Sequence, residues 1–404
     1  MRTRIPAGTR RQVGTASADI HPVPFFTQAG TFEELWPLIS RQVGEVFDRG
    51  KFSHGRKVAE FEKAIGEYTG ARHAIGVNSG TDALVLLLRA AGIGPGDEVV
   101  VPAFTFFASA SAVTMARATP VFADITGDGD YALDPVSVEA AITDRTRAVL
   151  PVHLFSQMAD MEALLDLARR RDLLVLEDSA EAIGMRWDGT HAGLLGTGGV
   201  LSFFPTKTLG ALGDAGMILT DDDQVAERAG VLRHHGRLGK TIDHIAGISN
   251  LSGVSGTNSK MDDVQAAVLM AKLSLLDEEI RRRRVLADAY TERLRGTDGV
   301  LAVPRLVPRG VASAPVFYVY VIEVERRDEL VAHLAGRGIG TETYYPQPLH
   351  TQPCYAGQHG RLSLPRAEEA CRRTLALPLY PDLTEAQLDT VCAAISDFYA
   401  GRQR

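Results

Sequence analysis

The sequence has few cysteines, no long apolar run and no excess of basic residues. Its 404 residues include three cysteines, Cys354, Cys371 and Cys392, which are odd in number and lack the spacing of a metal site. We expect free thiols in a reducing cytoplasm, and no metal. No apolar stretch reaches the ~18 residues of a membrane-spanning helix. The formal net charge of -7 argues against a nucleic-acid-binding protein, which needs a basic surface.

The remaining composition is that of a globular protein with a sizeable core. Hydrophobic residues make up 45% and charged residues 23% of the chain. The N-terminus is basic and lacks the apolar core of a secretory signal. We expect a flexible arm over residues 1–20, a large domain over 21–275 and a smaller domain over 276–404.

Apolar strands alternate with helices in the first half of the chain. Strands are predicted over residues 73–77, 99–102, 120–124, 148–152 and 173–178, with a helix over residues 161–171 between the last two. Nearly all-apolar strands separated by helices indicate an α/β domain with a mainly parallel sheet covered on both faces. Ligands bind such sheets at the carboxyl ends of the strands, where Asp178 lies. A carboxylate at this place is common, so Asp178 alone indicates no particular function.

The segments outside this region are predicted to be mostly helical. Thr31 is expected to cap a helix that ends near Arg49. One or two long helices are expected over residues 261–290, with the arginines 281–284 on a solvated face. A smaller α+β domain would contain strands over residues 317–322 and 341–345, and a helix from Thr384 to Tyr399 would close the chain.

A single lysine follows the apolar run that ends at Phe204. Lys207 comes after Pro205, in a loop with three glycines. A free lysine has a pKa near ~10.4, so it is an ammonium at neutral pH and a poor nucleophile. Burial, a neighbouring positive charge or a bond to a carbonyl cofactor would allow it to take part in catalysis. The alternative is a surface lysine in a turn.

A second polar turn connects the strand 73–77 to a long apolar helix. Ser79, Gly80 and Thr81 stand where that helix begins. Free backbone N–H groups, hydroxyls and the positive end of the helix dipole suit a phosphate. The alternative is that Ser79 or Thr81 only caps the helix.

Together these features match the needs of pyridoxal phosphate. Its phosphate needs the donors of residues 79–81, and its ring needs a flat apolar neighbour such as Phe106. Its pyridine nitrogen needs a carboxylate such as Asp178 to stay protonated. Its aldehyde needs an amine, which Lys207 offers 29 residues later.

Five motifs carry a resemblance to a known family: Asn-Ser-Gly-Thr-Asp-Ala-Leu (78–84), Pro-Ala-Phe-Thr-Phe (102–106), Glu-Asp-Ser-Ala (177–180), Ser-Phe-Phe-Pro-Thr-Lys (202–207) and Gly-Thr-Asn-Ser-Lys-Met (256–261). From about residue 23 to the C-terminus the chain resembles the DegT/DnrJ/StrS sugar aminotransferases, which are aspartate-aminotransferase-like proteins of fold type I. The resemblance implies a three-layer α/β/α large domain, a smaller α+β C-terminal domain and a cytoplasmic homodimer with shared active sites.

The resemblance also implies a role for each matching residue. Lys207 would bond to the cofactor aldehyde and later shuttle protons, while Asp178 would pair with the pyridinium. Phe106 would stack on the ring. The phosphate would be bound by Ser79, Gly80, Thr81 and Ser202.

Further residues are implied around these. Asn258 and Lys260 would reach the phosphate or substrate from the neighbouring subunit; the family usually has Arg in this motif, and Lys260 loses its bidentate geometry. Tyr344, Tyr345 and His350 would line the sugar pocket, with core packing as their alternative role.

Glu181 departs from the family pattern. The family commonly has Gln or His here, near the 3-hydroxyl of the cofactor. A carboxylate beside that phenolate would repel it unless protonated or hydrogen-bonded. Some members that aminate carbon 4 of 6-deoxy sugars share this Glu.

The resemblance implies a transaminase that moves an amino group from glutamate, through the pyridoxamine form of the cofactor, to a nucleotide-linked keto-deoxysugar. The first expectation is dTDP-4-keto-6-deoxyhexose, for a secondary metabolite such as an antibiotic or for a surface glycan. Amination at carbon 3, or of a cyclitol or aminobenzoate precursor, is the close alternative. A sugar dehydratase of the same fold would have His in place of Lys207. A non-catalytic regulator and a structural protein without cofactor are alternatives of other classes.

Overall fold

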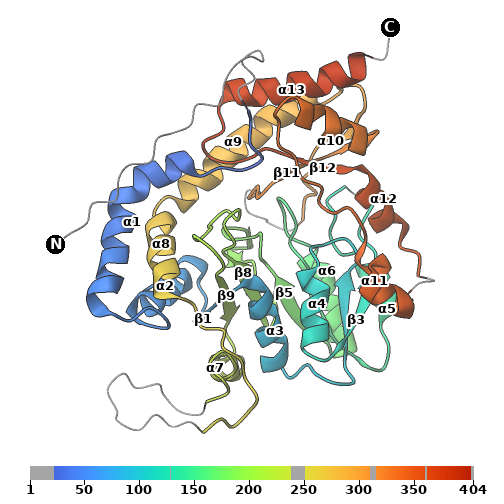
Figure 1. Cartoon of the computed structure of the whole chain (residues 1–404). Coiled ribbons are helices and arrows are strands. Elements are labelled where there is room, and N and C mark those ends of the chain that lie inside the picture. Colours follow the sequence, from blue (N-terminus) through green and yellow to red (C-terminus); the bar gives the residue numbers. More distant parts are fainter. Residues whose placement is uncertain (1–21, 128, 238–250, 310–314, 360–361, 402–404) are drawn as a thin grey trace, which may run out of the picture.

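The computed structural model describes residues 22–127, 129–237, 251–309, 315–359 and 362–401, so the expected arm over residues 1–20 lies outside the described residues (Figure 1). Its centre is a seven-stranded sheet. In spatial order the strands are β1 (His73–Val77), β9 (Gly216–Thr220), β8 (Gly198–Ser202), β5 (Leu174–Asp178), β4 (Thr146–Val149), β2 (Glu98–Pro102) and β3 (Thr119–Ala123). Only β9 runs antiparallel to its neighbours, which confirms the mainly parallel sheet.

Helices cover both faces of this sheet. Alternate residues of a strand point to opposite faces: Val200 packs with the cluster that contains α3, and Leu201 packs with the cluster that contains α2. The first face carries α3 (Gly80–Ala90), α4 (Ala108–Met115) and α7 (Asp223–Leu232). The opposite face carries α2 (Arg56–Thr69), α5 (Pro135–Ala141), α6 (Met161–Arg171) and α8 (Asp263–Leu273), with α1 (Ala29–Arg49) packed on α8. The predicted three-layer α/β/α architecture is confirmed.

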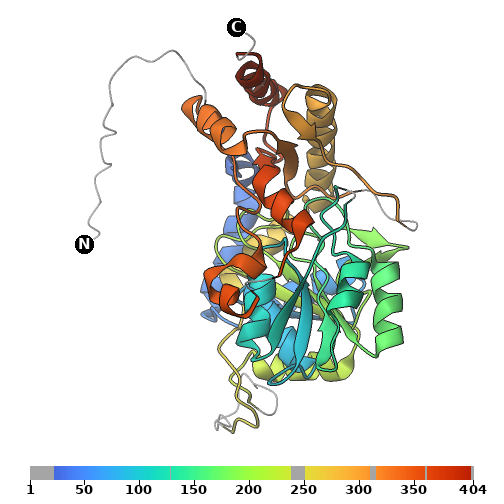
Figure 2. The same cartoon turned by 90° about the vertical axis from the view of Figure 1, so that its right-hand side faces the viewer.

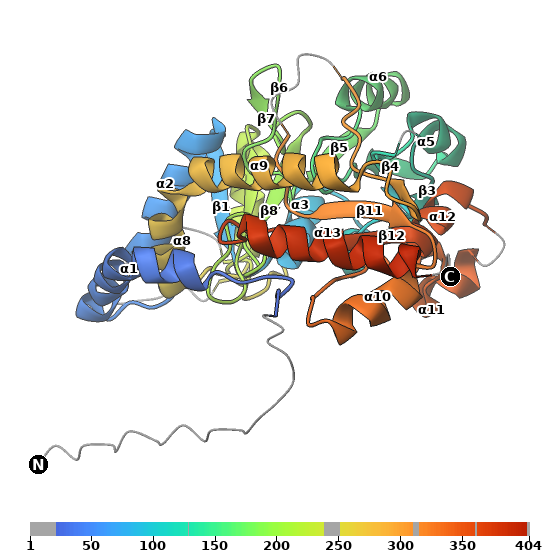
Figure 3. The ribbon, with the colours of Figure 1, turned by 90° about the horizontal axis from the view of Figure 1, so that it is seen from above.

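A second hydrophobic core forms above the large sheet in Figure 1. Its antiparallel sheet consists of β10 (Val300–Ala302), β11 (Tyr320–Val324) and β12 (Thr374–Leu377). Its helices are α9 (Leu276–Leu294), α10 (Arg327–Gly336) and α13 (Glu385–Ala400), and Figure 3 shows α9 and α13 running alongside each other. Because α9 begins at Leu276, we keep the domain boundary near residue 275 as a proposal.

Part of the C-terminal region returns to the large sheet. It contains a 3-10 helix (Leu349–Thr351), α11 (Pro353–His359) and α12 (Pro365–Arg373), and Figure 2 shows this red-orange segment descending from the C-terminal helices. The Leu349 N–H donates to the Ala103 carbonyl at 2.8 Å. A small hairpin of β6 (Arg186–Trp187) and β7 (Thr190–His191) completes the fold.

Strand β9 was not predicted, and it positions the loop that carries Lys207. Ser202 at the end of β8 pairs with Gly216 at the start of β9. The connection over residues 203–215 therefore leaves the sheet and returns to it at the same end of the strands. The carboxyl ends of the parallel strands lie at this end of the sheet.

Two predictions about local structure are wrong. The first long helix begins at Ala29 rather than at a Thr31 cap, and the Thr31 hydroxyl instead lies 3.5 Å from Glu279 Oε1. Residues 341–345 form no strand; only Glu342 makes an isolated bridge, to Ala376 of β12. In both places the side chain or backbone meets a residue far away in the sequence, Glu279 for Thr31 and Ala376 for Glu342.

The prediction of a solvated arginine face is wrong for Arg283. Arg281 and Arg284 are exposed, but Arg283 is buried in α9. Its Nη1 donates to the carbonyls of Tyr318 at 3.0 Å and Leu379 at 2.7 Å. A buried guanidinium needs such acceptors, which local sequence cannot reveal.

Candidate functional site

A pocket of about 320 Å³ lies at the carboxyl edge of the large sheet. Its walls come from the turn after β1, the segment after β2, the end of β5, the β8–β9 connection and the C-terminal region. Of the residues singled out in the sequence, the pocket brings together Ser79, Gly80, Thr81, Phe106, Asp178, Glu181, Ser202, Lys207, Tyr344 and Tyr345.

One end of the pocket is the first turn of α3. Ser79 is the N-cap of α3, and its Oγ accepts the Asp82 N–H at 3.1 Å; a phosphate contact of Ser79 stays a prediction. Capping leaves the N–H groups of Gly80 and Thr81 without an acceptor inside the helix. A Cβ atom on Gly80 would lie 2.8 Å from Ser202 Cβ. Glycine therefore lets the helix start approach the end of β8, which forms a cradle that suits a phosphate.

Asp178 also lines the pocket and is the last residue of β5. Its carboxylate is buried; Oδ2 accepts the Ser109 hydroxyl at 2.7 Å and Oδ1 accepts the Ala180 N–H at 3.3 Å. Burial raises the pKa of Asp178 above its ordinary value, although these hydrogen bonds and Lys207 act in the opposite direction. A buried carboxylate of this kind gains from a cationic partner in the pocket.

A buried His–Glu pair supports the end of β5. The Ala159 N–H donates to His153 Nδ1 at 3.1 Å, so Nε2 carries the proton and donates to Glu177 Oε2 at 2.9 Å. The Glu177 carboxylate also accepts backbone N–H groups within residues 193–196, at 2.7–2.8 Å. Sequence reasoning missed this pair, although Glu177 directly precedes the aspartate that it supports.

Lys207 points into the pocket and is no surface lysine. Its side chain is 15% exposed, and Nζ donates to Glu181 Oε1 at 3.1 Å. Nζ also lies 4.1 Å from the centre of the Tyr318 ring. Burial lowers the pKa of Lys207, but Glu181, Tyr318 and Asp178 outweigh burial and hold it above the ordinary value.

Gln28 and Lys272 hold the loop that carries Lys207 through hydrogen bonds to its backbone carbonyls. Gln28 Nε2 donates to the Pro205 carbonyl at 3.3 Å, and Lys272 Nζ donates to Gln28 Oε1 at 2.8 Å and to the Gly210 carbonyl at 2.7 Å. Burial lowers the pKa of Lys272 to about 8. No sequence signal pointed to Gln28 or Lys272, because Gln28, directly before α1, and Lys272, in α8, both lie far from this loop in the sequence.

Aromatic side chains form the remaining walls. Phe106 is 59% exposed and lines the pocket, where an aromatic ring can stack on a planar group. Its ring centre lies 6.4 Å from that of Tyr345. Burial raises the pKa values of Tyr344 and Tyr345, so both hydroxyls stay protonated and able to donate.

Three residues singled out in the sequence lie outside this pocket. Lys260 pairs with Val77 at the edge of β1, and its Nζ donates to Asn258 Oδ1. A contact of Asn258 and Lys260 with a neighbouring subunit stays a prediction. His350 is buried against Phe122, with ring centres 6.5 Å apart, as its core-packing alternative has it.

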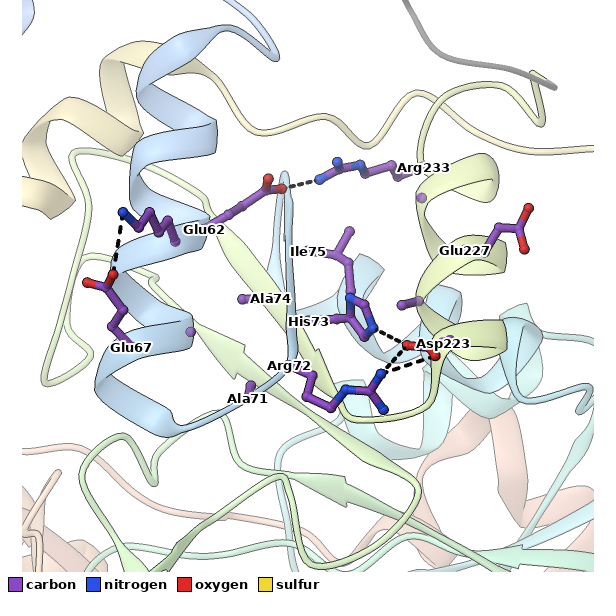
Figure 4. Close-up of a pocket in the computed structure, with 14 residues that line it drawn as sticks. Glu62, Glu67, Ala71, Arg72, His73, Ala74, Ile75, Asp223, Glu227 and Arg233 are labelled. Carbon is purple, nitrogen blue, oxygen red and sulfur yellow. Dashed lines mark hydrogen bonds and ion pairs between the residues drawn. The ribbon is translucent and has the colours of Figure 1, made fainter.

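A larger hollow of about 710 Å³ lies at the outer edge of β1 (Figure 4). Glu62 accepts the Gly76 N–H at 2.8 Å, and Arg233 donates to the Gly76 carbonyl at 2.7 Å. Arg72 pairs with Asp223 at 2.9 Å. These charges neutralise one another and cover an edge strand, and the residues with predicted chemistry lie elsewhere.

Within the described ranges, no helix is long and apolar enough to cross a membrane. The same part of the chain contains no group of three or more His, Cys, Asp or Glu side chains placed to hold a metal ion.

Comparisons with known proteins agree with this geometry. A family model described as the DegT/DnrJ/EryC1/StrS aminotransferase family matches residues 37–396. The chain is 44% identical over 379 residues to "Pleiotropic regulatory protein" of Geobacillus stearothermophilus, covering 93% of this chain and 98% of that one. It is 42% identical over 385 residues to "dTDP-3-amino-3,4,6-trideoxy-alpha-D-glucose transaminase" of Streptomyces venezuelae, covering 95% and 98%. The solved structure of S. venezuelae DesV in complex with a ketimine intermediate superposes with a TM-score of 0.87 at 42% identity, covering 94% and 98%.

Proposed function

Because the chain belongs to the DegT/DnrJ/EryC1/StrS aminotransferase family, we propose that it transfers the amino group of glutamate to a ketone on a nucleotide-linked deoxysugar. Members of this family are pyridoxal-phosphate-dependent transaminases, so this chain is one. The observation that carries the proposal is Lys207, whose amine lies in one pocket with the buried Asp178 carboxylate and the free N–H groups of α3.

The pocket residues fit pyridoxal phosphate, which supplies an electron sink when bound. Gly80, Thr81 and Ser202 would hold the phosphate, and the Asp178 carboxylate would keep the pyridine nitrogen protonated. Lys207 Nζ would carry protons to and from the reacting carbon. These assignments rest on the shared pocket and on the chemistry of each group.

For the acceptor we propose a dTDP-linked keto-deoxysugar with the ketone at carbon 3. The support is the S. venezuelae relative, whose name describes a 3-amino sugar. The carbon-4 ketone expected from the sequence is the second candidate, because Glu181, the residue on which that expectation rests, lines the pocket.

We further propose a homodimer whose partner covers the mouth of the pocket. Phe106, Phe204 and Leu212 are each about half exposed or more, and the first two line the pocket. Exposed apolar side chains that gather at one place are typical of an interface. Asn258 and Lys260 would then approach the partner's pocket.

The G. stearothermophilus relative is named a regulatory protein, so a non-catalytic regulator is the competing function. A regulator has no need of an amine, a carboxylate and a phosphate cradle in one pocket. Catalysis by the purified protein distinguishes the two functions.

The test is amino transfer by purified protein supplied with pyridoxal phosphate and glutamate. The dTDP-linked 3-keto and 4-keto deoxysugars are offered separately, and the aminated product is identified by mass. Lys207→Ala should lower turnover by at least ~10²–10⁴-fold through loss of proton transfer alone. Lys63→Ala is the matched control, because the Lys63 side chain is 79% exposed. Full activity of Lys207→Ala would overturn the proposal, and product from only one ketone would settle the carbon.

A further inference from the structure

Phe155 and Tyr318 connect Glu181 to Lys207 through the backbone. The Phe155 N–H donates to Glu181 Oε2 at 3.0 Å, and the Phe155 carbonyl accepts the Tyr318 N–H at 2.8 Å. Lys207 Nζ contacts both of the residues that Phe155 holds, because it donates to Glu181 Oε1 and lies over the Tyr318 ring. These contacts connect the end of β5 to the C-terminal region.

Phe155 adopts a backbone conformation that a bulky residue rarely takes. Its φ is +63°, in the left-handed region. Such strain persists only where the surroundings hold it in place. Here both backbone groups are used, and the buried ring packs against Phe104, Tyr131 and Tyr345. Phe155 therefore holds Glu181 through its N–H and Tyr318 through its carbonyl, and these are the two residues that contact the Lys207 amine.

The Tyr318 ring is held from several sides. Its hydroxyl lies 3.1 Å from Thr206 Oγ1 and 3.4 Å from the Tyr344 hydroxyl, and its carbonyl accepts Arg283 Nη1 at 3.0 Å. The side chain is buried, so water does not compete with the ring for the cation. A cation over the face of a desolvated aromatic ring is attracted more strongly than one at the surface.

We propose that Tyr318 is a positioning residue that, with Glu181, forms a resting site for the free Lys207 ammonium. The site would serve whenever Lys207 is not bonded to the cofactor, and it rests on the proposed function in that respect alone. Between the carboxylate and the ring face, the amine is held protonated and away from the rest of the pocket. Phe155 fixes the spacing of the two walls.

The resting site sets the pH at which Lys207 becomes a nucleophile. Only the neutral amine attacks the aldehyde carbon of pyridoxal phosphate, forming a C=N bond with loss of water. Glu181, Tyr318 and Asp178 act electrostatically on the amine, and the titratable groups Tyr344 and Asp214 line the same pocket from the C-terminal region and the β8–β9 connection. Removing the Tyr318 ring weakens the hold on the proton, so the neutral amine appears at lower pH.

The test measures covalent attachment of pyridoxal phosphate to the full-length protein after cofactor removal. The rate is followed by visible absorbance across pH, and borohydride reduction with peptide mass identifies Lys207 as the site. Tyr318→Leu, which lacks the ring, should shift the midpoint of the rate profile down by about one pH unit, a tenfold change in the protonation equilibrium. Tyr318→Phe keeps the ring and should stay within a few tenths of a unit. Tyr68→Leu on α2 is the control.

Glu181→Gln provides an independent reading, and its midpoint should also fall. Tyr318→Met replaces Tyr318→Leu if circular dichroism shows that the latter does not fold. Profiles of the ring-less variant or of Glu181→Gln that coincide with wild type would overturn the inference, as would equal shifts in Tyr318→Phe and Tyr318→Leu. If wild type itself forms no adduct at Lys207, the proposed function fails instead.

Discussion

Gly80 should tolerate no side chain, because the start of α3 touches the end of β8 there. The Cβ atom of an alanine would lie 2.8 Å from Ser202 Cβ, whereas ordinary contacts begin at 3.4 Å. Neither atom moves with a side-chain rotation, so only a backbone shift of about 0.6 Å (3.4 − 2.8) relieves the clash. Overpacking of this kind costs about 1–3 kcal/mol. The same shift displaces the N–H groups of Gly80 and Thr81, so affinity for pyridoxal phosphate should fall at least ~10-fold, or about 1.4 kcal/mol.

The assay has two readouts and two comparison variants. Urea unfolding of the cofactor-free protein gives the stability change, and a titration with pyridoxal phosphate gives the affinity. Gly230→Ala on α7 is the matched control: a Cβ there meets nothing within 4 Å, so alanine should stabilise by about 0.5–1 kcal/mol. The double variant Gly80→Ala/Ser202→Gly removes the clashing Cβ and should recover stability, but not affinity, because the Ser202 hydroxyl is lost. Wild-type affinity in Gly80→Ala would refute the phosphate cradle at this turn.

Two further predictions concern buried charges. The pKa of Lys272 is lowered from 10.5 to about 8, so between these pH values the unfolded chain holds a proton that the folded chain has released. Stability of wild type relative to Lys272→Met should therefore rise from pH 7.5 to 9.5, by at most ~1.4 kcal/mol per unit; a constant difference in urea unfolding would contradict this. Burial raises the pKa of Asp178 above the ordinary carboxyl value, so ionisation of this carboxyl lowers the stability of the folded protein at neutral pH. Cofactor-free Asp178→Asn should melt higher than wild type while amino transfer falls by at least ~10²-fold, and a lower melting temperature with unchanged turnover would refute both statements.

Short-range patterns were sufficient for many of the elements. The predicted helix over residues 161–171 matches α6, whose start is capped by Asp160 three residues before Ala163. The helix predicted from Thr384 begins there, with a capping box between Thr384 and Gln387. These interactions join residues three positions apart, so the local sequence contains both partners.

Long-range pairing decided the elements that the sequence analysis missed. Strand β9 is antiparallel in a sheet of otherwise parallel strands, and its partner residues 73–77 in β1 lie far away in the chain. Arg283 stands in a run of four arginines that look alike in sequence, yet only its side chain meets the carbonyls of Tyr318 and Leu379.

The candidate site divides in the same way. Short motifs that follow predicted strands were sufficient to recognise Lys207, Asp178 and the turn at residues 79–81. The groups that hold them were not recognisable in this way: Ser109 meets Asp178 across 69 positions, and Lys272 meets Gln28 across 244. Serines and lysines are frequent and have no motif for such contacts, so only the packing of distant helices and strands selects the ones that act. The sequence by itself thus determined which groups could react, and the tertiary structure decided how each one is held, buried and charged.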